Sequence, residues 1–577
     1  MERSIRSNLI PGRAMTCAVT VVDVPRCPKP RHDRLVVAAK VINFDKARAE
    51  ATSQRQFALG EGVARSTLQG WVTRRERIEA KPSVVAFCES PDGVEFIHGI
   101  YAAALYTFTK DGPDGIRRMQ AFVKASPLSP FVASSFGAIQ KSSKIMDGNI
   151  LTYDAEQTAI MGKVMQPKKV SVAEDESFFP RTCLVAIEPV SDYILLEEYA
   201  DNRTAATWNA ALKKCLDGLP VIVIQTVSDQ ARGLICHAMT GLGAHHSPDL
   251  FHVQRELGKA FGPLFRSLLR RGEAAIAETT KTIDLEIKAC DEYVSQIENR
   301  GPGRPPDFEG RIEAAKAALA AAQENLAAIK KQQEETYAEI RGIGLDHHPF
   351  DLKTGEARQA EDVKKDVDRR FETLEATADD VDMSEQLRKY IKKAGRVTPD
   401  LIATIAFFWG VVRQTIEEQK LSQPMEQFLL GTLIPIAYLS LVLGKLKDRA
   451  MKDIVRATIA KLQQAVDATG SPIGALDAEA RAAMFALAQQ CAEFFQRSSS
   501  CVEGRNGVLS LHHHAGRNLP SRRLRVLKTI HNFGIKRADG TTAAFRLSGY
   551  RHPDLFRWIL KRQPLPARPA RTVAKAS

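Results

Sequence analysis

Apolar residues recur at helical spacing on both sides of a glycine in residues 53–76, SQRQFALGEGVARSTLQGWVTRRE. The pattern predicts a first helix that ends near Leu59 and a tight turn at Gly62. A second helix follows, with Leu68 and Trp71 on its inner face. This arrangement is typical of a helix-turn-helix, which presents the start of its second helix to the major groove of DNA. An ordinary helical hairpin produces the same short pattern and is the alternative.

The outer face of this second helix is polar and basic. The side chains expected to read bases are Arg65, Ser66, Thr67 and Gln69. Those expected to meet phosphates are Arg74, Arg75 and Arg77. We therefore assign residues 51–82 to a helix-turn-helix DNA-binding module, preceded by a flexible segment, 1–50, and followed by a helical domain, 83–167.

At about residue 168 the pattern becomes strand-like. Three short runs rich in Val, Ile and Leu predict three consecutive strands: KKVSVAED, RTCLVAIEPV and DYILLEEYA. A helical stretch, TAATWNAALKKCLDGL, leads to PVIVIQTVSD, an uninterrupted apolar run of the kind buried on both faces of a sheet. The order strand, strand, strand, helix, strand predicts a mixed α/β layer domain over residues 168–263.

Strand signals are absent from residues 264–495, which predict an all-helical region. Apolar residues recur there on a seven-residue step in two runs, 276–297 and 312–340, as they do in long paired helices. The connector NRGPGRPP, residues 299–306, breaks both runs, so we expect an antiparallel helical hairpin. Its Gly-Arg-Pro core is similar to a minor-groove-binding hook, although a simple hairpin loop explains the same residues.

The longest apolar run, FLLGTLIPIAYLSLVLG, spans residues 428–444 and contains Pro435. It is shorter than the ~20 residues that cross a membrane, and the proline interrupts it. We therefore expect a buried pair of helices and no membrane partner.

Basic charge is concentrated at the ends of the 577-residue chain, which is long enough for several domains. The net charge is +13; residues 501–577 hold 16 basic and 3 acidic side chains, and residues 1–82 hold 16 and 8. Two basic ends around a neutral to acidic middle indicate that a polyanion, first of all nucleic acid, is held at two places. A solvated basic tail would also account for the C-terminal excess.

The nine cysteines are spread singly, without a CxxC pair. This distribution argues against a disulfide scaffold and a four-cysteine zinc site, and it indicates a reducing compartment. The N-terminal residues lack the apolar core of a signal peptide, so we expect a cytoplasmic protein. Five potential metal ligands cluster with spacings that match no common zinc pattern: Cys236, His237, His245, His246 and His252.

Three carboxylates stand where a metal-dependent, phosphodiester-cleaving site would need them. Asp175 lies at the end of the first predicted strand, and Asp229 closes the buried strand. Glu503 lies in SSSCVEGRNGVLSLHHH, a predicted helix. Such sites commonly use two divalent ions about 3.5 to 4 Å apart, and Mg²⁺ prefers oxygen ligands. Glu174 and Glu176 are the nearest substitutes for Asp175.

These carboxylates also have structural explanations. Ser228 and Asp229 could cap the helix that begins at QARGL. Ser500 and Glu503 fit the spacing of a capping box, in which the glutamate binds a backbone amide. Asn506 shares a helix face with Glu503, where it either orients substrate or a metal-bound water or simply adds to a polar surface.

Together these residues resemble a DDE-type transposase of the bacterial insertion-sequence kind, whose catalytic domain is similar to retroviral integrases and ribonuclease H. The matching segments are AEDESFF, VSDQARGL, SPDLFHVQREL and VEGRNGVLSLHHHAGRNLPSRRLRVLKTIHNF. They lie within residues 168–263 and 495–560. The resemblance implies a multidomain α+β protein whose RNase H-like core is interrupted by the helical insertion, 264–495. The core then resumes in residues 496–577 with its last helix and a basic C-terminal region.

The resemblance further implies a DNA transposase that hydrolyses phosphodiesters and transfers strands at element ends. Asp175, Asp229 and Glu503 would hold two Mg²⁺ or Mn²⁺ ions. The partners would be the double-stranded DNA of element ends and target, and further copies of the chain in a homo-oligomer. The basic residues expected beside the metals are Arg517, Arg522, Arg523, Arg525 and Lys528. The alternatives are a catalytically inactive or domesticated DNA-binding regulator and a structure-specific nuclease of the same fold.

Overall fold

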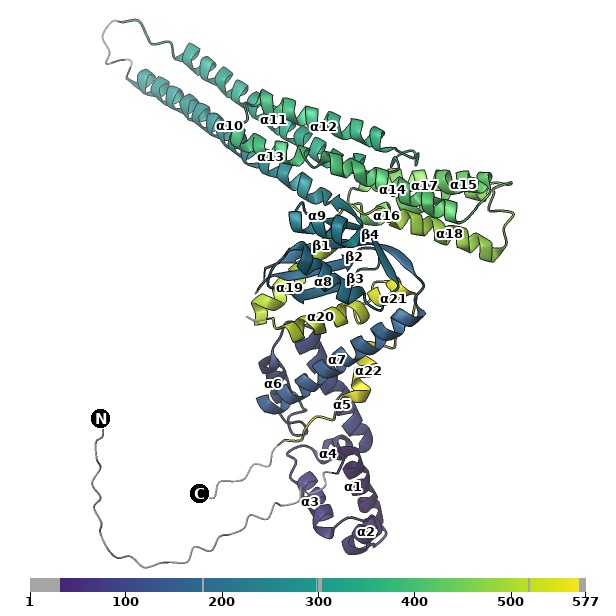
Figure 1. The fold of residues 1–577 in the computed structure, drawn as a ribbon. Helices are drawn as coiled ribbons and strands as arrows, with labels where there is room; N and C mark the ends of the chain where they lie inside the picture. Colours follow the sequence, from purple (N-terminus) through teal and green to yellow (C-terminus); the bar gives the residue numbers. More distant parts are fainter. Residues whose placement is uncertain (1–31, 179–180, 297, 299–302, 517–518, 570–577) are drawn as a thin grey trace, which may run out of the picture. The chain divides into compact units, whose positions relative to one another are not determined.

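The computed structural model describes residues 32–178, 181–296, 298, 303–516 and 519–569 (Figure 1). The chain is a mixed α+β protein that divides into two compact units. The terminal unit combines Met1–Tyr101, Val123–Ala133 and Leu565–Ser577. The central unit combines Ala102–Phe122 and Ser134–Pro564. The chain passes between the units along α5 (Pro91–Tyr106) and α6 (Ile116–Ala125).

Four helices open the terminal unit: α1 (Arg34–Ala49), α2 (Gln54–Gly60), α3 (Arg65–Glu76) and α4 (Pro82–Cys88). The flexible start expected through residue 50 is therefore wrong for residues 34–49. The side chain of Asp33 caps α1 by accepting a hydrogen bond from the backbone of Leu35. Phe44 of α1 packs with Leu68 and Val72 of α3, so tertiary burial stabilises a helix whose own periodicity is weak.

A tight turn joins α2 to α3. Ser53 and Gln56 form a capping box at the start of α2, which satisfies backbone amides that the helix cannot pair internally. Gly62 lies between the helices at φ +66°, a conformation that costs glycine little and other residues more. Leu68 is fully buried, whereas Trp71 is only partly buried and contacts His32 edge-on.

The central unit contains one five-stranded sheet. Its strands are β1 (Lys168–Ser177), β2 (Cys183–Glu188), β3 (Tyr193–Tyr199), β4 (Val221–Ser228) and β5 (His245–Pro248). The strand order is β3-β2-β1-β4-β5; β1, β2 and β3 are antiparallel neighbours, while β1, β4 and β5 run parallel. The four strands expected from the sequence are confirmed. The fifth strand, β5, is not predicted from the sequence, because HHSP has neither alternation nor β-branched residues.

Helices cover both faces of the sheet. One face packs Ala173, Val185 and Ile194 against Val502 and Leu509. The last two residues belong to α19 (Ser500–Gly516), beside which α20 (Ser521–Phe533) lies on the same core. On the other face, α8 (Ala205–Leu216) is followed after β4 by α9 (Arg232–Cys236) and the π-helical turn η2 (His237–Leu242). The long helix α7 (Phe136–Val164) packs on α20 and α22.

The remaining C-terminal and connecting helices are short. They are η1 (Thr107–Asp111), α21 (Ala543–Ser548) and α22 (Leu555–Arg562). Both α20 and α21 contact β3, so the chain's last helices complete the layer on that side of the sheet.

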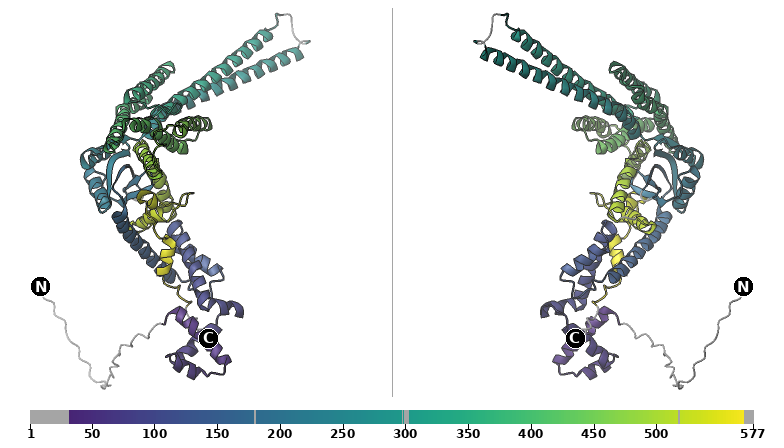
Figure 2. Two further views of the ribbon diagram at one scale, coloured as in Figure 1. Left: turned by 90° about the vertical axis from the view of Figure 1, so that its right-hand side faces the viewer. Right: turned by 90° about the vertical axis from the view of Figure 1, so that its left-hand side faces the viewer.

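A large helical insertion separates β5 from α19, as the sequence predicts, but its first helix begins at Leu250 rather than near residue 264. The helices are α10 (Leu250–Ser295), α11 (Phe308–Asp346), α12 (Ala360–Asp380), α13 (Glu385–Gly395), α14 (Thr398–Glu418), α15 (Gln423–Phe428), η4 (Leu429–Leu433), α16 (Ile434–Lys445), α17 (Arg449–Asp467) and α18 (Ala478–Glu493). The expected hairpin is confirmed: α10 and α11 lie side by side in Figures 1 and 2. Part of its connector, residues 299–302, lies outside the described residues, so the hook-like Gly-Arg-Pro reading stays open.

The apolar run at residues 428–444 forms one continuous stretch of helix, not the expected pair. A π-helical turn, η4, precedes Pro435, which sits in the first turn of α16. A π-helical turn is wider than an α-helical one, so it accommodates Pro435, which lacks an amide hydrogen, and the helix does not break.

Two helical stretches are long and apolar enough to cross a membrane by length and composition alone, Glu385–Glu418 and Gln423–Lys445. In their most apolar windows, 39% and 33% of the residues are buried inside the protein. Leu401, Phe408 and Leu429 from these stretches belong to the main hydrophobic core of the insertion. These residues therefore take part in the packing of the insertion.

Candidate functional site

Asp175 lies near the end of β1, on the sheet face that α19 covers. Side chains alternate along a strand, and Ala173, two residues earlier, contacts the α19 core. One oxygen of Asp175 accepts a hydrogen bond from the backbone amide of Glu176 at 2.8 Å. The other accepts one from the Asn506 side chain of α19 at 3.1 Å. The strand and the late helix therefore meet at this carboxylate.

Asp229 and Glu503 lie close enough to Asp175 to affect its proton affinity. In the parallel pairing of β1 with β4, Ala173 stands opposite Val227, so Asp175 and Asp229 follow at the same level of the sheet. Burial raises the pKa of Asp175 to about 6, and the negative charges of Asp229 and Glu503 add to the increase. Three carboxylates far apart in the sequence thus form one acidic cluster.

Structural roles account for only part of this cluster. One oxygen of Asp229 accepts the backbone amide of Ala231 at 2.9 Å, so the expected capping role is partly real. Helix α19 begins at Ser500, and the residue before it, Ser499, binds Asp249 with its hydroxyl. Within the described part of the chain, the Glu503 side chain makes no hydrogen bond, so the capping-box explanation does not account for it.

Glu174 and Glu176, the possible substitutes for Asp175, point to the opposite face of the sheet. Glu174 is fully buried and lies 3.1 Å from the Nε2 of His237. Glu176 accepts a hydrogen bond from the indole of Trp208 at 3.3 Å. Because both carboxylates face α8 and η2, neither can join Asp229 and Glu503 on the α19 side.

The donor atoms of the cluster suit a hard divalent cation. All of the carboxylate donors are oxygens, and the Oδ1 of Asn506 is buried beside Asp175 with no hydrogen-bond partner in the described residues. Over those same residues, however, no group of three or more His, Cys, Asp or Glu side chains is arranged to hold a metal ion. The two-metal site therefore stays a prediction.

A cleft of about 410 Å³ opens beside Asp229. It is lined by His252 and Glu256 of α10 and by Lys393 and Arg396 at the end of α13, and Lys393 forms an ion pair with Glu256 at 3.3 Å. His252 also lies near enough to lower the pKa of Asp175. The helical insertion therefore supplies basic side chains next to the acidic cluster, a contribution that the sequence alone did not reveal.

The five potential zinc ligands do not share one site. His237 binds Glu174 and Asn209, His246 lies 3.0 Å from the hydroxyl of Ser228, and His245 stacks on Phe407. Cys236 is exposed. His252 faces the cleft beside Asp229 instead. These histidines act mainly as packing and hydrogen-bonding groups around β5 and η2.

The candidate base-reading residues lie at the start of α3. Arg65, Ser66 and Gln69 are exposed, and Thr67 is partly buried. Arg74 donates a hydrogen bond to the backbone carbonyl of Pro569. Arg75 forms a bidentate ion pair with Asp45. The start of the helix is therefore free to contact a partner, whereas the charge of Arg75 is already paired.

The basic residues of α20 mostly bind backbone carbonyls of the protein itself. Arg522 and Arg523 donate to the carbonyls of Lys144 and Gly112. Lys528 donates to the carbonyl of Leu195 at 2.7 Å, and Arg525 is exposed. Arg517 lies outside the described residues. Helix α20 packs on β3 and α7 and shares the core of β1 and α19, so the placement of these side chains beside the metals stays a prediction.

Comparison with known proteins gives one match. Residues 429–575 are similar to a protein family of unknown function, DUF6399. That segment covers the end of the insertion, α19 with Glu503, and the C-terminal helices. No curated protein and no solved structure matches the chain.

Proposed function

We propose that the protein is a DDE-type DNA transposase that cleaves and transfers DNA strands at the ends of a mobile element. The observation that carries this proposal is the meeting of Asp175, Asp229 and Glu503 on one side of the sheet. They come from the first strand, the end of the fourth strand and a late helix, the order that the family resemblance implies.

The architecture around the cluster supports an RNase H-like core. The central strand β1 has the antiparallel strands β2 and β3 on one side and the parallel strands β4 and β5 on the other. A helix that follows a long insertion supplies the third carboxylate. In the cleft beside Asp229, Lys393 and Arg396 offer contacts for the DNA backbone. The exposed start of α3 supports a separate helix-turn-helix that recognises element ends.

The protein's own residues have distinct roles in this mechanism. Asp175, Asp229 and Glu503 would hold divalent ions, which supply a stronger nucleophile and stabilise the leaving oxygen. Asn506 orients Asp175 through its side-chain amide. Arg396 holds the strand's phosphates by charge, and Lys393 joins it by exchanging its ion pair with Glu256 for a phosphate. Transposition requires two ends to be brought together, so we also propose a homo-oligomer acting on cytoplasmic, nucleoid-associated DNA.

The test is cleavage by the full-length protein and three variants, Asp175→Asn, Asp229→Asn and Glu503→Gln. DNA carrying the element ends is incubated with Mg²⁺ or Mn²⁺, and nicked products and DNA binding are measured separately. Each variant should lose cleavage by at least about 100-fold, because metal coordination fails. Each should bind DNA as the unchanged protein does.

The matched control is Glu176→Gln, which alters the neighbouring residue on the opposite sheet face. It should cleave normally. A Glu176→Gln protein that loses cleavage while Asp175→Asn keeps it would refute the assignment. An unchanged protein that binds DNA but cleaves with neither ion would favour the inactive or domesticated regulator.

A further inference from the structure

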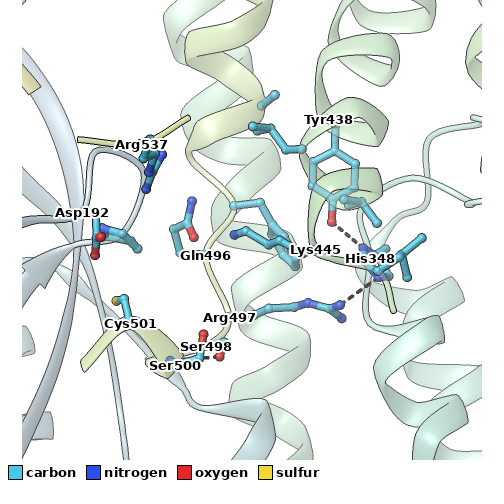
Figure 3. Close-up of a pocket in the computed structure, with 16 residues that line it drawn as sticks. Asp192, His348, Tyr438, Lys445, Gln496, Arg497, Ser498, Ser500, Cys501 and Arg537 are labelled. Carbon is cyan, nitrogen blue, oxygen red and sulfur yellow. Dashed lines mark hydrogen bonds between the residues drawn. The ribbon is translucent and has the colours of Figure 1, made fainter. Parts of the chain in front are cut away.

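A second cavity, of about 640 Å³, lies in the central unit away from the acidic cluster (Figure 3). Its walls come from α16, from the segment that joins α18 to α19, and from the turn between β2 and β3. Leu441, Val442 and Phe495 give it an apolar side. The volume is within the range of pockets that bind small organic ligands.

Three cationic side chains line this cavity: Lys445, Arg497 and Arg537. Arg497 donates only to neutral acceptors, the carbonyls of Gly344 and His347 and the ring of His348. Among the described residues, neither Lys445 nor Arg537 has a side-chain hydrogen bond or an ion pair within 4.0 Å.

The nearby acids do not neutralise these cations. Glu188 is the last residue of β2, and its two carboxylate oxygens accept hydrogen bonds from the backbone amides of Val190 and Ser191. Asp192 lines the cavity, and its nearest ionic contact is His531, at 3.8 Å. Arg497 is partly buried, whereas Lys445 and Arg537 are exposed, and the three side chains together present positive charge to an anionic occupant of the cavity.

A hydrogen-bond relay directs one more donor toward this cavity. A guanidinium only donates, so the Nε2 of His348 must accept from Arg497. The Nδ1 of His348 then carries the hydrogen and donates to the hydroxyl oxygen of Tyr438 at 2.5 Å. Burial and Arg497 hold the pKa of His348 well below its usual range, consistent with this neutral tautomer.

The relay leaves the hydroxyl hydrogen of Tyr438 without an acceptor among the described residues. Tyr438 is only 3% exposed and lines the cavity. Buried hydroxyl groups nearly always donate to an acceptor, so we expect this hydrogen to meet one inside the cavity. In Figure 3 the hydroxyl oxygen of Tyr438 lies on the side of the ring that faces Lys445 and Arg497.

We propose that this cavity binds the phosphate of a nucleotide-sized ligand, held by Lys445, Arg497, Arg537 and the Tyr438 hydroxyl. The apolar side of the cavity would contact the organic part of the ligand, which inorganic phosphate lacks. The same phosphate chemistry is present in a free mononucleotide and in the 5′-terminal nucleotide of a DNA strand. The proposal is independent of strand cleavage at Asp175.

The test is calorimetric titration of the full-length protein with pyrophosphate, AMP, and oligonucleotides with and without a 5′-phosphate. Lys445→Gln and Arg537→Gln should each weaken binding about tenfold or more, because each removes a charge-assisted contact. Tyr438→Phe should weaken it by a smaller factor. Arg497 is not substituted, because it also holds two backbone carbonyls.

The matched control is Lys447→Gln, which removes an exposed cation two residues from Lys445 and outside the cavity lining. It should leave affinity unchanged. Preference for AMP indicates a free nucleotide, and preference for the 5′-phosphorylated oligonucleotide indicates a DNA end. No binding at millimolar concentration, or equal losses in Lys445→Gln and Lys447→Gln, would overturn the proposal. Asp175→Asn should bind the ligand with unchanged affinity. Ligand affinity and DNA cleavage therefore test the cavity and the transposase proposal separately.

Discussion

Asp175 is the residue whose surroundings most change its chemistry. It is partly buried, faces two other carboxylates and accepts hydrogen bonds from the Glu176 amide and Asn506. Its alternation with Glu174 and Glu176 follows from the strand period and could be predicted once β1 was recognised. The hydrogen bond between Asp175 and Asn506 could not be predicted, because no local pattern pairs residues that lie so far apart in the chain.

The pKa of Asp175 makes stability depend on pH. The folded-state pKa is raised from 3.8 to about 6, so the folded protein binds the proton more tightly than the unfolded chain between these values. Relative to a neutral side chain, this group therefore has little effect on the free energy of unfolding below about pH 4 and lowers it by roughly 3 kcal/mol at most above about pH 6.

We therefore expect Asp175→Asn, without metal, to raise the unfolding temperature at pH 8 and to have little effect at pH 4. Thermal unfolding followed by circular dichroism would measure both. Asp201→Asn, at an exposed aspartate after β3, should shift the unfolding temperature little at either pH. An equal gain for Asp175→Asn at the two pH values would contradict the raised pKa.

At the scale of elements, α19 is fixed to the sheet by a buried ion pair. Arg505 of α19 and Glu197 of β3 share two hydrogen bonds, at 2.6 and 2.8 Å, and their side chains are 4% and 0% exposed. Glu503 lies two residues earlier on the same helix. The pair therefore sets the position of the third carboxylate without touching it.

Arg505→Met should destabilise the central unit by about 3 to 5 kcal/mol, because it leaves the Glu197 carboxylate buried and uncompensated. Denaturant unfolding measures this loss. The double variant Glu197→Leu with Arg505→Met should recover much of it, since no buried charge is then left unpaired. If the double variant were as unstable as the sum of both single variants, the pair would not be coupled.

Helix α7 offers a second element-scale test. A Cβ at Gly162 would lie 2.0 Å from the carbonyl oxygen of Gly218, in the turn before β4. Gly162→Ala should therefore cost about 1 to 3 kcal/mol, because the backbone must shift. Gly137→Ala, near the start of the same helix and in open space, should be neutral or stabilise by up to about 1 kcal/mol. Similar unfolding midpoints for the two variants would show that this contact is loose.

At the scale of the whole molecule, the terminal unit is built from distant parts of the sequence. Arg34 and Arg568 both pair with Glu89, and the Ala133 amide donates to the Ala567 carbonyl. Arg74 of α3 also donates to the carbonyl of Pro569. The C-terminal segment thus belongs to the fold that carries the proposed DNA-reading helix.

A chain shortened after Pro564 should lose stability in the terminal unit and bind DNA more weakly, while the central unit unfolds as before. Limited proteolysis and DNA titration at two salt concentrations would measure these effects. A chain shortened after Pro569 is the control, since it loses Arg571 and Lys575 but keeps the packed segment. If both truncations weakened binding equally, the basic tail rather than the packing would be responsible.

The sequence by itself determined the local elements: the two helices around Gly62, four strands, the long hairpin and the late helix that carries Glu503. Hydrophobic period and turn residues encode these, because they depend on neighbours a few positions away. Three carboxylates could also be chosen from their places in that order.

Packing in three dimensions determines which side chains meet. It places Asn506 beside Asp175, turns Glu174 and Glu176 to the opposite face, and brings Arg523 to the carbonyl of Gly112. It also added β5 and the cationic cavity. These outcomes depend on packing between segments that lie hundreds of residues apart, and no local periodicity records such contacts.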